Sequence, residues 1–296
     1  MSMSRSKHIV LSRIGLALTS LVSLVGCSPL RILDTFIGED GYAAEYGLGY
    51  GTGPRQVLDV YTPTQDSARR PVIVFFYGGG WRDGDRDEYR FVADALTSRG
   101  YITVIPDYRL FPGHQFPTFM EDGAEAIAWV LEHLEDIGGD PERVYLMGHS
   151  AGAHIAALLT VDERYLTKAG VPGGSLAGTI ALAGPYAFYP SQTESVAPIF
   201  ANLTDEDLAR PVTFVDGSEP PFLLLHGEED RTVYPSNTTE LSDALRSAGG
   251  QVTEKFYPDI GHFKILLTLA GLLPDYAPVL SDMANFIDGR SLAVQE

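Results

Sequence analysis

Short apolar runs alternate with longer amphipathic stretches from about residue 57 to residue 288. The runs are bounded by Gly or Pro and are rich in branched and aromatic residues, which is typical of buried strands. The stretches between them repeat apolar residues at helical spacing and often end at glycine, which indicates helices. The predicted strands are 57–61, 72–77, 102–106, 144–147, 179–183, 222–226 and 252–257, and the predicted helices are 86–99, 117–137, 151–161, 236–248 and 278–288.

Continuous apolar strands separated by helices indicate an α/β fold, with a mostly parallel central sheet covered by helices on both faces. Only 57–61 alternates like an antiparallel first strand. A segment of about residues 184–220, rich in Pro, Tyr and Phe, is predicted to be a small cap insert. We therefore expect one domain over 57–296, preceded by a Gly- and Tyr-rich tether or loosely packed arm over 27–56.

Residues 1–26 are typical of a secretion signal. Arg5, Lys7 and Arg13 precede a short apolar core that is too short to span a bilayer. The core ends in Leu-Val-Gly-Cys27, which resembles the bacterial lipoprotein processing box, and Cys27 is the only cysteine of the chain. The resemblance implies an exported protein that is acylated at Cys27 and attached to a membrane there alone. An ordinary signal peptide with an incidental cysteine is the alternative.

The formal net charge of −18 changes the expected partners. Such an acidic chain is a poor match for nucleic acid, and its folded surface is a poor match for anionic lipid. No cluster of His, Cys and Asp has the spacing of metal ligands. With nucleic acid, anionic lipid and metal ions disfavoured, we expect the partner of this protein to be a small-molecule substrate.

The sequence Gly148-His149-Ser150-Ala151-Gly152 lies between a predicted strand and a predicted helix. In such an elbow the central serine has a strained backbone, and its hydroxyl is pushed out above the sheet edge. The two glycines are expected because strand and helix approach too closely there for side chains. The amide groups at the helix N-terminus favour developing negative charge. Ser150 is therefore the candidate nucleophile.

A serine hydroxyl needs a base that is held by an acid, and after such an elbow the order along the chain is Ser, then Asp or Glu, then His. His262 follows the last predicted strand. Asp230 follows the strand that ends at His226, with Glu228 and Glu229 beside it. We expect Asp230 to be the acid, because the turn must bring a short side chain back to the loop of His262. The predicted triad is Ser150–Asp230–His262.

The sequence Tyr-Gly-Gly-Gly-Trp at 77–81 follows another predicted strand. Successive glycines let backbone amides face a substrate carbonyl, so we assign an oxyanion hole to the amides of Gly79, Gly80 and Ala151. A phosphate-binding loop would instead carry Lys-Ser or Lys-Thr after the glycines, whereas Trp81-Arg82 follows here.

Aromatic residues near these motifs are the expected walls of a substrate pocket: Trp81, Tyr186, Phe188, Tyr189 and Phe200. Other polar residues near the motifs are expected to be structural. His149 and His154 are predicted to pack under the elbow and on its helix. Asp107 and Arg109 are predicted to pair beneath the oxyanion loop.

Together, YGGGW, PDYRL at 106–110, GGDPERVYLMGHSAGAH and HGEED…GH resemble the α/β-hydrolase superfamily over about residues 57–290. The similar branch is the carboxylesterases akin to hormone-sensitive lipase, feruloyl or acetyl-xylan esterases and kynurenine formamidases. The resemblance implies a Ser, Asp and His triad as assigned above and no cofactor; His-Gly-x-x-Asp in that family matches His226 to Asp230. One departure is Tyr77, because the family usually has a loop-ordering His before the glycines.

The preferred hypothesis is a serine carboxylic-ester hydrolase that forms an acyl-enzyme, acting on short-acyl or small aromatic esters. Amide hydrolysis, as in formamidases or peptidases of this superfamily, is the alternative within enzymes. A non-catalytic surface lipoprotein on a hydrolase fold is the alternative of another class.

Overall fold

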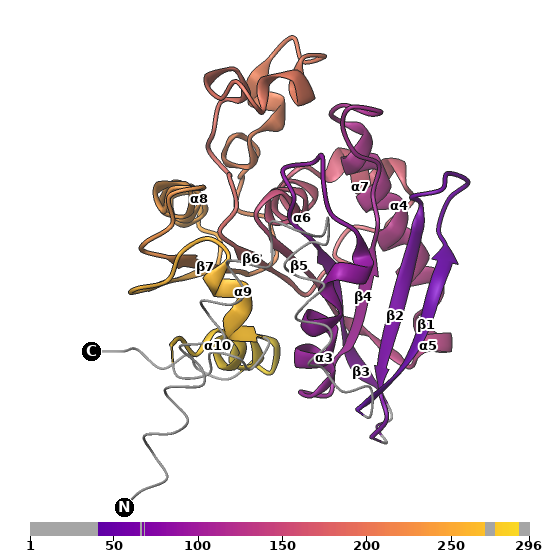
Figure 1. Ribbon diagram of the computed structural model, residues 1–296. Coiled ribbons are helices and arrows are strands. Elements are labelled where there is room, and N and C mark those ends of the chain that lie inside the picture. Colours follow the sequence, from indigo (N-terminus) through magenta and orange to yellow (C-terminus); the bar gives the residue numbers. More distant parts are fainter. Residues whose placement is uncertain (1–40, 66, 68, 270–275, 290–296) are drawn as a thin grey trace, which may run out of the picture.

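The computed structural model describes residues 41–65, 67, 69–269 and 276–289. Its centre is an eight-stranded sheet with the order β1-β2-β4-β3-β5-β6-β7-β8 (Figure 1). β2 is antiparallel to β1 and β4, and β3 to β8 are parallel. The strands are β1 (Tyr42–Gly49), β2 (Val57–Pro63), β3 (Arg70–Phe76), β4 (Ile102–Pro106), β5 (Gly139–His149), β6 (Gly178–Leu182), β7 (Phe222–Gly227) and β8 (Val252–Tyr257). The mostly parallel sheet predicted from the apolar runs is confirmed.

Helices cover both faces of the sheet (Figure 1). One group of contacting helices is α4 (Thr118–Glu132), α6 (Ala151–Val161) and α7 (Glu163–Lys168), with α8 (Ser236–Ser247) packed on β7 and β8. On the other face, α9 (Lys264–Leu269) contacts both α3 (Arg90–Thr97) and α10 (Val279–Ile287). Two predicted helices are divided: a 3₁₀ turn, η1 (Arg86–Tyr89), precedes α3, and α5 (Leu134–Ile137) follows α4.

β1 is a correction to the sequence prediction, which expected a loop or loosely packed arm at these residues. It pairs with β2 along the edge of the sheet. Only Tyr42 of its eight residues is buried. An edge strand is held by backbone hydrogen bonds while most of its side chains face solvent, so it carries little apolar periodicity to detect.

The segment between β6 and β7 stands above the carboxyl edge of the sheet (Figure 1). It contains only short 3₁₀ turns: η2 (Pro190–Gln192), η3 (Ala197–Phe200), η4 (Glu206–Ala209) and η5 (Pro211–Thr213). The core below it is built from the fully buried strands β3, β4, β6 and β7.

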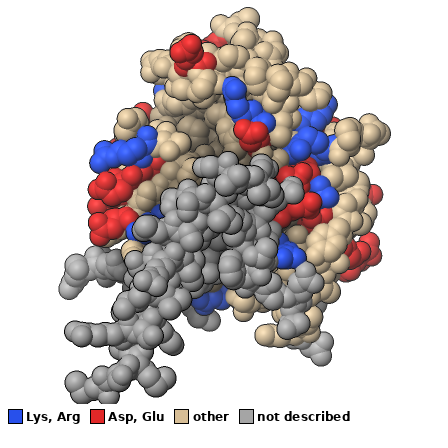
Figure 2. Space-filling view, viewed as in Figure 1, with Lys and Arg blue, Asp and Glu red and all other residues tan. Residues whose placement is uncertain are grey.

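Acidic and basic side chains are interspersed on the face shown in Figure 2. Within the described ranges, no helix has the length and apolar character needed to cross a bilayer. The predicted signal segment and Cys27 lie outside the described residues.

Candidate active site

The elbow after β5 holds Ser150 in a backbone conformation that side chains rarely adopt, with φ 56° and ψ −121°. Close packing makes both neighbouring glycines necessary. A Cβ on Gly148 would lie 2.2 Å from the carbonyl oxygen of Gly152, and one on Gly152 would lie 2.0 Å from that of Phe76. A positive φ costs about 1–3 kcal/mol and persists only where the surroundings enforce it. Here β3, β5 and α6 enforce it together.

The three predicted triad residues meet at the carboxyl edge of the sheet. Ser150 follows β5, Asp230 lies just past β7, and His262 lies in the loop after β8. His262 Nε2 is 2.8 Å from Ser150 Oγ, and His262 Nδ1 is 2.7 Å from Asp230 Oδ2. Because a carboxylate only accepts, Nδ1–H donates to Asp230, and Nε2 is left to accept from the serine hydroxyl. This geometry can move a proton from the hydroxyl to the imidazole.

Asp230 is buried and both of its carboxylate oxygens are occupied. Oδ1 accepts from the amides of Thr232 at 2.8 Å and Val233 at 2.9 Å, while Oδ2 accepts from His262 and, at 3.3 Å, from His226. Burial alone raises the pKa of this carboxyl, but the hydrogen bonds from the two histidines outweigh burial and hold the pKa below its usual range. Asp230 is therefore a carboxylate at every pH near neutrality.

Glu228 and Glu229, the two other candidates for the acid, are exposed. Neither contacts His262: the Glu229 side chain pairs at 3.2 Å with Arg231, which is itself exposed. Of the three neighbouring carboxylates, Asp230 is therefore the one whose hydrogen bond reaches His262.

Two further histidines, His226 and His149, contact the triad, and the sequence analysis did not predict this role for them. His226, with no exposed surface, also donates to the carbonyl of Val233 at 2.9 Å, while its Nδ1 lies 2.7 Å from Thr238 Oγ1. His149 Nε2 lies 2.9 Å from the carbonyl oxygen of His262. The one available signal was position, since His149 is the last residue of β5 and His226 the last but one of β7, and these strands lead to Ser150 and Asp230.

His149 and His154 are buried, as predicted. Burial lowers the pKa of His149 to about 3 and that of His154 to about 4, so both rings are neutral at neutral pH. His154 Nε2 contacts the carbonyl oxygen of Ala209, 2.7 Å away at the base of the insert. His149 therefore holds the β8–α9 loop through the carbonyl of His262, and His154 holds the insert through the carbonyl of Ala209.

The glycine loop after β3 lies beside the elbow. Gly79 is exposed and Gly80 is half-buried, with φ of 128° and 60°. A Cβ on Gly79 would lie 2.0 Å from the carbonyl oxygen of Asp83. Over the described part of the chain, the backbone amides of Gly79, Gly80 and Ala151 donate to no other backbone or side-chain acceptor. These donors are therefore available to an oxygen that approaches Ser150.

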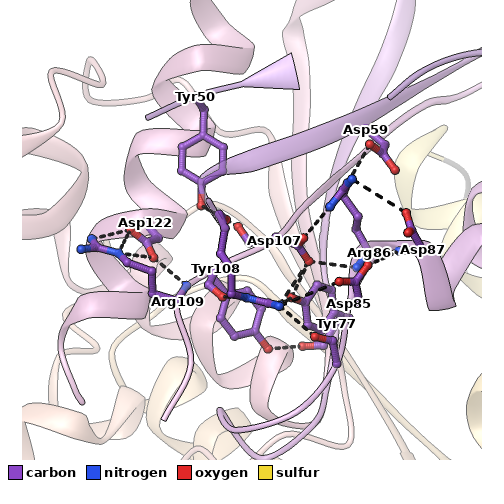
Figure 3. A network of polar contacts seen from close by, with 12 residues as sticks. Tyr50, Asp59, Tyr77, Asp85, Arg86, Asp87, Asp107, Tyr108, Arg109 and Asp122 are labelled. Atoms are coloured by element: carbon purple, nitrogen blue, oxygen red, sulfur yellow. Dashed lines mark hydrogen bonds and ion pairs between the residues drawn. The ribbon is translucent and has the colours of Figure 1, made fainter. Parts of the chain in front are cut away.

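Tyr77, at the start of this loop, replaces the expected histidine with a different anchor. Its ring stacks between those of Tyr89 and Tyr108, with centroid separations of 5.2 Å and 4.7 Å. Its hydroxyl donates to Asp107 Oδ1 at 2.7 Å (Figure 3). The Tyr108 hydroxyl in turn donates to the Tyr77 carbonyl at 2.8 Å. The loop therefore starts from a rigid aromatic stack.

The predicted pair of Asp107 and Arg109 does not form. Asp107 pairs with Arg86 at 2.6 Å, and Arg109 pairs with Asp122 at 2.6 Å (Figure 3). In extended chain, residues two apart share a side only when the strand is regular; this segment lies past the end of β4, where the chain turns out of the sheet. Each side chain therefore finds a partner from a different part of the fold.

The predicted pocket residues differ in exposure: Trp81, Tyr186 and Phe200 are buried, Phe188 is half-buried and Tyr189 is exposed. Trp81 packs under the insert, stacked on Phe188 at 5.8 Å and edge-on to Phe200 at 5.1 Å. Tyr189 is 40% exposed, whereas Tyr186 has no exposed surface and accepts from the Gly184 amide at 3.1 Å. Tyr186 therefore supports the base of the insert from inside, which corrects the expectation that it lines the pocket.

A cavity of about 700 Å³ lies at the far end of α6, away from the triad. Its lining includes Asp162, Arg164, Phe214 and Glu219, and none of the triad residues. In the described ranges no group of three or more His, Cys, Asp or Glu side chains is placed to hold a metal ion.

Known proteins with the same features have been found by sequence and by fold. The BD-FAE family model matches residues 58–178. Esterase LipQ of Mycobacterium tuberculosis is 31% identical over an alignment of 279 residues that covers 86% of this chain and 65% of LipQ. Isoprenylcysteine alpha-carbonyl methylesterase ICME of Arabidopsis thaliana is 30% identical over an alignment of 242 residues that covers 74% of this chain and 56% of that protein. The chain thus spans roughly three fifths of the length of these relatives.

The solved structure of inhibited esterase B from Lactobacillus rhamnosis superimposes with a TM-score of 0.76 and 20% identity. It covers 94% of this chain and 96% of its own. At 20% identity this similarity shows the fold alone. It is consistent with the strand order of the sheet and with the elbow at Ser150. The chain has the α/β-hydrolase fold, and its sequence is similar to carboxylesterases of the hormone-sensitive lipase and feruloyl esterase type.

Proposed function

We propose that the protein is a serine carboxylic-ester hydrolase that works through an acyl-enzyme. The observation that carries this proposal is the unbroken hydrogen-bonded series from Asp230 through His262 to Ser150, with contacts of 2.7 Å and 2.8 Å. The names of the relatives point the same way, because LipQ is called an esterase and ICME a methylesterase.

In the proposed first half-reaction, Ser150 Oγ attacks the ester carbonyl carbon while His262 Nε2 takes the hydroxyl proton. The carbonyl electron pair moves onto its oxygen, which the amides of Gly79, Gly80 and Ala151 stabilise. Collapse of this intermediate breaks the bond to the alcohol oxygen, and His262 gives that oxygen its proton. The acyl group is left on Ser150.

In the second half-reaction, water gives a proton to His262 and attacks the acyl carbon. Collapse then returns the proton to Ser150 Oγ and releases the acid. Asp230 stays ionised throughout and stabilises the imidazolium. Its lowered pKa supports this role.

We propose short-acyl or small aromatic esters as the substrates. The insert beside the site is short, consists of 3₁₀ turns and packs Phe188 and Phe200 onto Trp81, which leaves no long amphipathic lid helix in its described residues. A panel of nitrophenyl esters of rising acyl length, together with feruloyl, acetyl-sugar and formyl-kynurenine substrates, tests the choice. Best rates on long chains, with activation at an oil–water interface, would contradict it.

A fluorophosphonate probe tests the reaction class. The probe should form one adduct on Ser150 of the wild-type protein and none on Ser150→Ala. Absence of an adduct, together with no turnover of any ester, would favour the non-catalytic lipoprotein. Turnover of formyl-kynurenine or amides in preference to every ester would favour an amide hydrolase.

We also propose export and attachment to a membrane through Cys27. The support is the processing box in the sequence. Radiolabelled palmitate should enter the wild-type protein and fail to enter Cys27→Ser, which should also be released from the membrane fraction. An unlabelled wild-type protein would rule out the anchor and leave the hydrolase proposal untouched.

A further inference from the structure

The segment 77–86, here called the oxyanion loop, has a backbone that the chain would not adopt unaided. Gly79, Gly80, Trp81 and Gly84 all have positive φ, at 128°, 60°, 58° and 107°. Such conformations persist where surrounding contacts enforce them. The contacts that hold this loop therefore decide where its amides point.

Two side chains from outside the loop each touch both of its ends. Asp107 accepts from the Tyr77 hydroxyl and from the Arg86 amide, and Arg55 donates to both ends. Arg55 Nη2 donates to the Tyr77 hydroxyl at 2.6 Å, at the start of the loop, and to the Gly84 carbonyl at 2.8 Å, near its end. The Nε of the same guanidinium donates to the carbonyl of Tyr108 at 2.8 Å. A planar guanidinium offers donors in a fixed arrangement, so Arg55 sets the separation of these three acceptors.

Arg55 is itself held by the turn between β1 and β2. The Tyr50 hydroxyl donates to the Asp107 carbonyl at 2.5 Å (Figure 3), and the side chain of Gln56 donates to Glu125 at 2.7 Å. The amide of Asp107 donates back to the carbonyl of Val57 at 2.9 Å. Hydrogen bonds to Asp107, just past the end of β4, therefore hold the turn on both sides of Arg55. The backbone position of Arg55 is thereby fixed.

Charge compensation alone does not require Arg55. Asp107 Oδ2 pairs with Arg86 at 2.6 Å and Asp107 Oδ1 accepts the Arg86 amide at 2.9 Å, whereas Arg55 is 3.3 Å from that carboxylate. Asp107 would therefore keep a cationic partner without Arg55. What Arg55 adds is a hydrogen-bonded link from the Tyr77 hydroxyl to the Gly84 carbonyl, at the place where the Tyr77 ring packs on Gly84.

We infer that Arg55 is a positioning residue that holds the oxyanion loop, through Tyr77 and Gly84, in the geometry that ester hydrolysis needs. It does not touch the reacting atoms, and the inference rests on the hydrolase function proposed above. It also offers a reason why Tyr77 can stand where the resemblance implies a loop-ordering histidine: the tyrosine is held by a neighbouring arginine.

The test compares Arg55→Met and Arg55→Lys with the matched control Arg143→Met. Arg143 is similarly exposed, at 35% against 30% for Arg55, and it also binds a carbonyl and a carboxylate, those of Ile287 and Asp288. It lies at the opposite end of the sheet, near the start of β5. The measurements are kcat and KM on nitrophenyl butyrate, the fraction of sites labelled by fluorophosphonate, the melting temperature, and Ki for an aryl trifluoromethyl ketone.

The ketone isolates the effect because its adduct with Ser150 carries an oxygen where the oxyanion would lie. Arg55→Met should lower kcat per labelled site by about 10- to 100-fold with KM nearly unchanged, and should weaken the ketone by a similar factor. Arg55→Lys should fall between this variant and wild type, because an ammonium restores charge but does not span the three acceptors. Arg143→Met should leave kcat and Ki within about twofold, as expected for a group that is remote from the chemistry.

An active wild-type protein whose Arg55→Met variant keeps kcat and Ki per labelled site would overturn the inference and leave the hydrolase proposal standing. An equal loss of kcat in Arg143→Met would also overturn it. The same holds if Arg55→Met lowers only the fraction of labelled sites and the melting temperature. A wild-type protein that neither turns over the ester nor reacts with the probe would overturn the hydrolase proposal, and the inference with it.

Discussion

The triad and the oxyanion loop meet at one edge of the sheet but are held there by different means. The triad residues follow β5, β7 and β8, which lie within four consecutive positions of the sheet order. The oxyanion loop follows β3, next to β5, and is held by side chains from the β1–β2 turn and the end of β4 (Figure 3). Backbone topology therefore places the triad, whereas a network of side chains shapes the loop.

This difference decides which mutations should be severe. The triad depends on its own three side chains, so single changes there remove the chemistry. The loop acts through backbone amides, so single changes around it shift those amides and cost less. Four predictions, from the largest expected effect to the smallest, test the triad and its buried histidines, and the Arg55→Met variant described above is the matching test of the loop.

The largest loss is expected from Ser150→Ala or His262→Ala. Each should lower kcat by on the order of 10⁶, because the triad acts as one unit. The far-ultraviolet circular dichroism should stay that of wild type. If purified Ser150→Ala keeps more than about a tenth of wild-type kcat, the nucleophile is another residue.

Asp230→Asn should lower kcat by roughly 10³ to 10⁴, since the amide keeps the shape but loses the charge that orients His262. Glu228→Gln and Glu229→Gln are the matched controls and should stay within about tenfold, because both carboxylates are exposed. One activated ester suffices for all three. A crippled Glu229→Gln beside an active Asp230→Asn would require a new acid.

His226→Leu should lower kcat about tenfold with little change in KM. Leucine removes the buried donor to Asp230, and a hydrogen bond to a charged group is worth roughly 1.5 kcal/mol. The control is His154→Leu, at an equally buried histidine that contacts the carbonyl oxygen of Ala209 instead, and it should stay within about threefold. If the two substitutions lowered kcat equally, the loss would come from general destabilisation and not from the contact between His226 and Asp230.

Each half also contains one buried neutral histidine, His149 behind the triad and His154 against Trp81 of the loop. Burial lowers the pKa of both, so the unfolded chain binds more protons than the folded chain below about pH 6.5. The contribution of each histidine to the free energy of unfolding is fully present above that pH. It falls as the pH drops toward 4, by at most about 1.4 kcal/mol per pH unit for each histidine.

Urea unfolding of wild type and His154→Gln at pH 7, 6 and 5 measures this slope. The variant should lose less stability per pH unit than wild type, whatever its stability at pH 7. Parallel slopes for the two proteins would show that His154 is protonated equally in both states.

The sequence predicted what depends on apolar runs and on position along the chain. Those runs gave β2 to β8 and the helix after the elbow, and the order of motifs gave Ser150, Asp230 and His262. β1 was missed because an edge strand exposes most of its side chains. The pairing of Asp107 with Arg109 was wrong because proximity along the chain does not fix where side chains point once a strand has ended.

The role of Arg55 had no sequence signal of its own, and that of His226 had only its position near the end of a strand. His226 reads as the last residue of an apolar strand, and its contact with Asp230 depends on the turn at Gly227. Arg55 reads as one charged residue in a glycine-rich segment. Its partners Tyr77, Gly84 and Tyr108 are between 22 and 53 residues away, so only folding brings them together.

The tight contact at Gly152 bears on how the two parts of this site are placed. The missing side chain lets α6 touch the end of β3 at the carbonyl oxygen of Phe76 and the start of the oxyanion loop at that of Tyr77. The helix that follows Ser150 and the strand that carries the loop are therefore in direct backbone contact. A side chain at position 152 would displace Ser150 and the oxyanion loop relative to each other, although it would touch neither the serine nor a substrate.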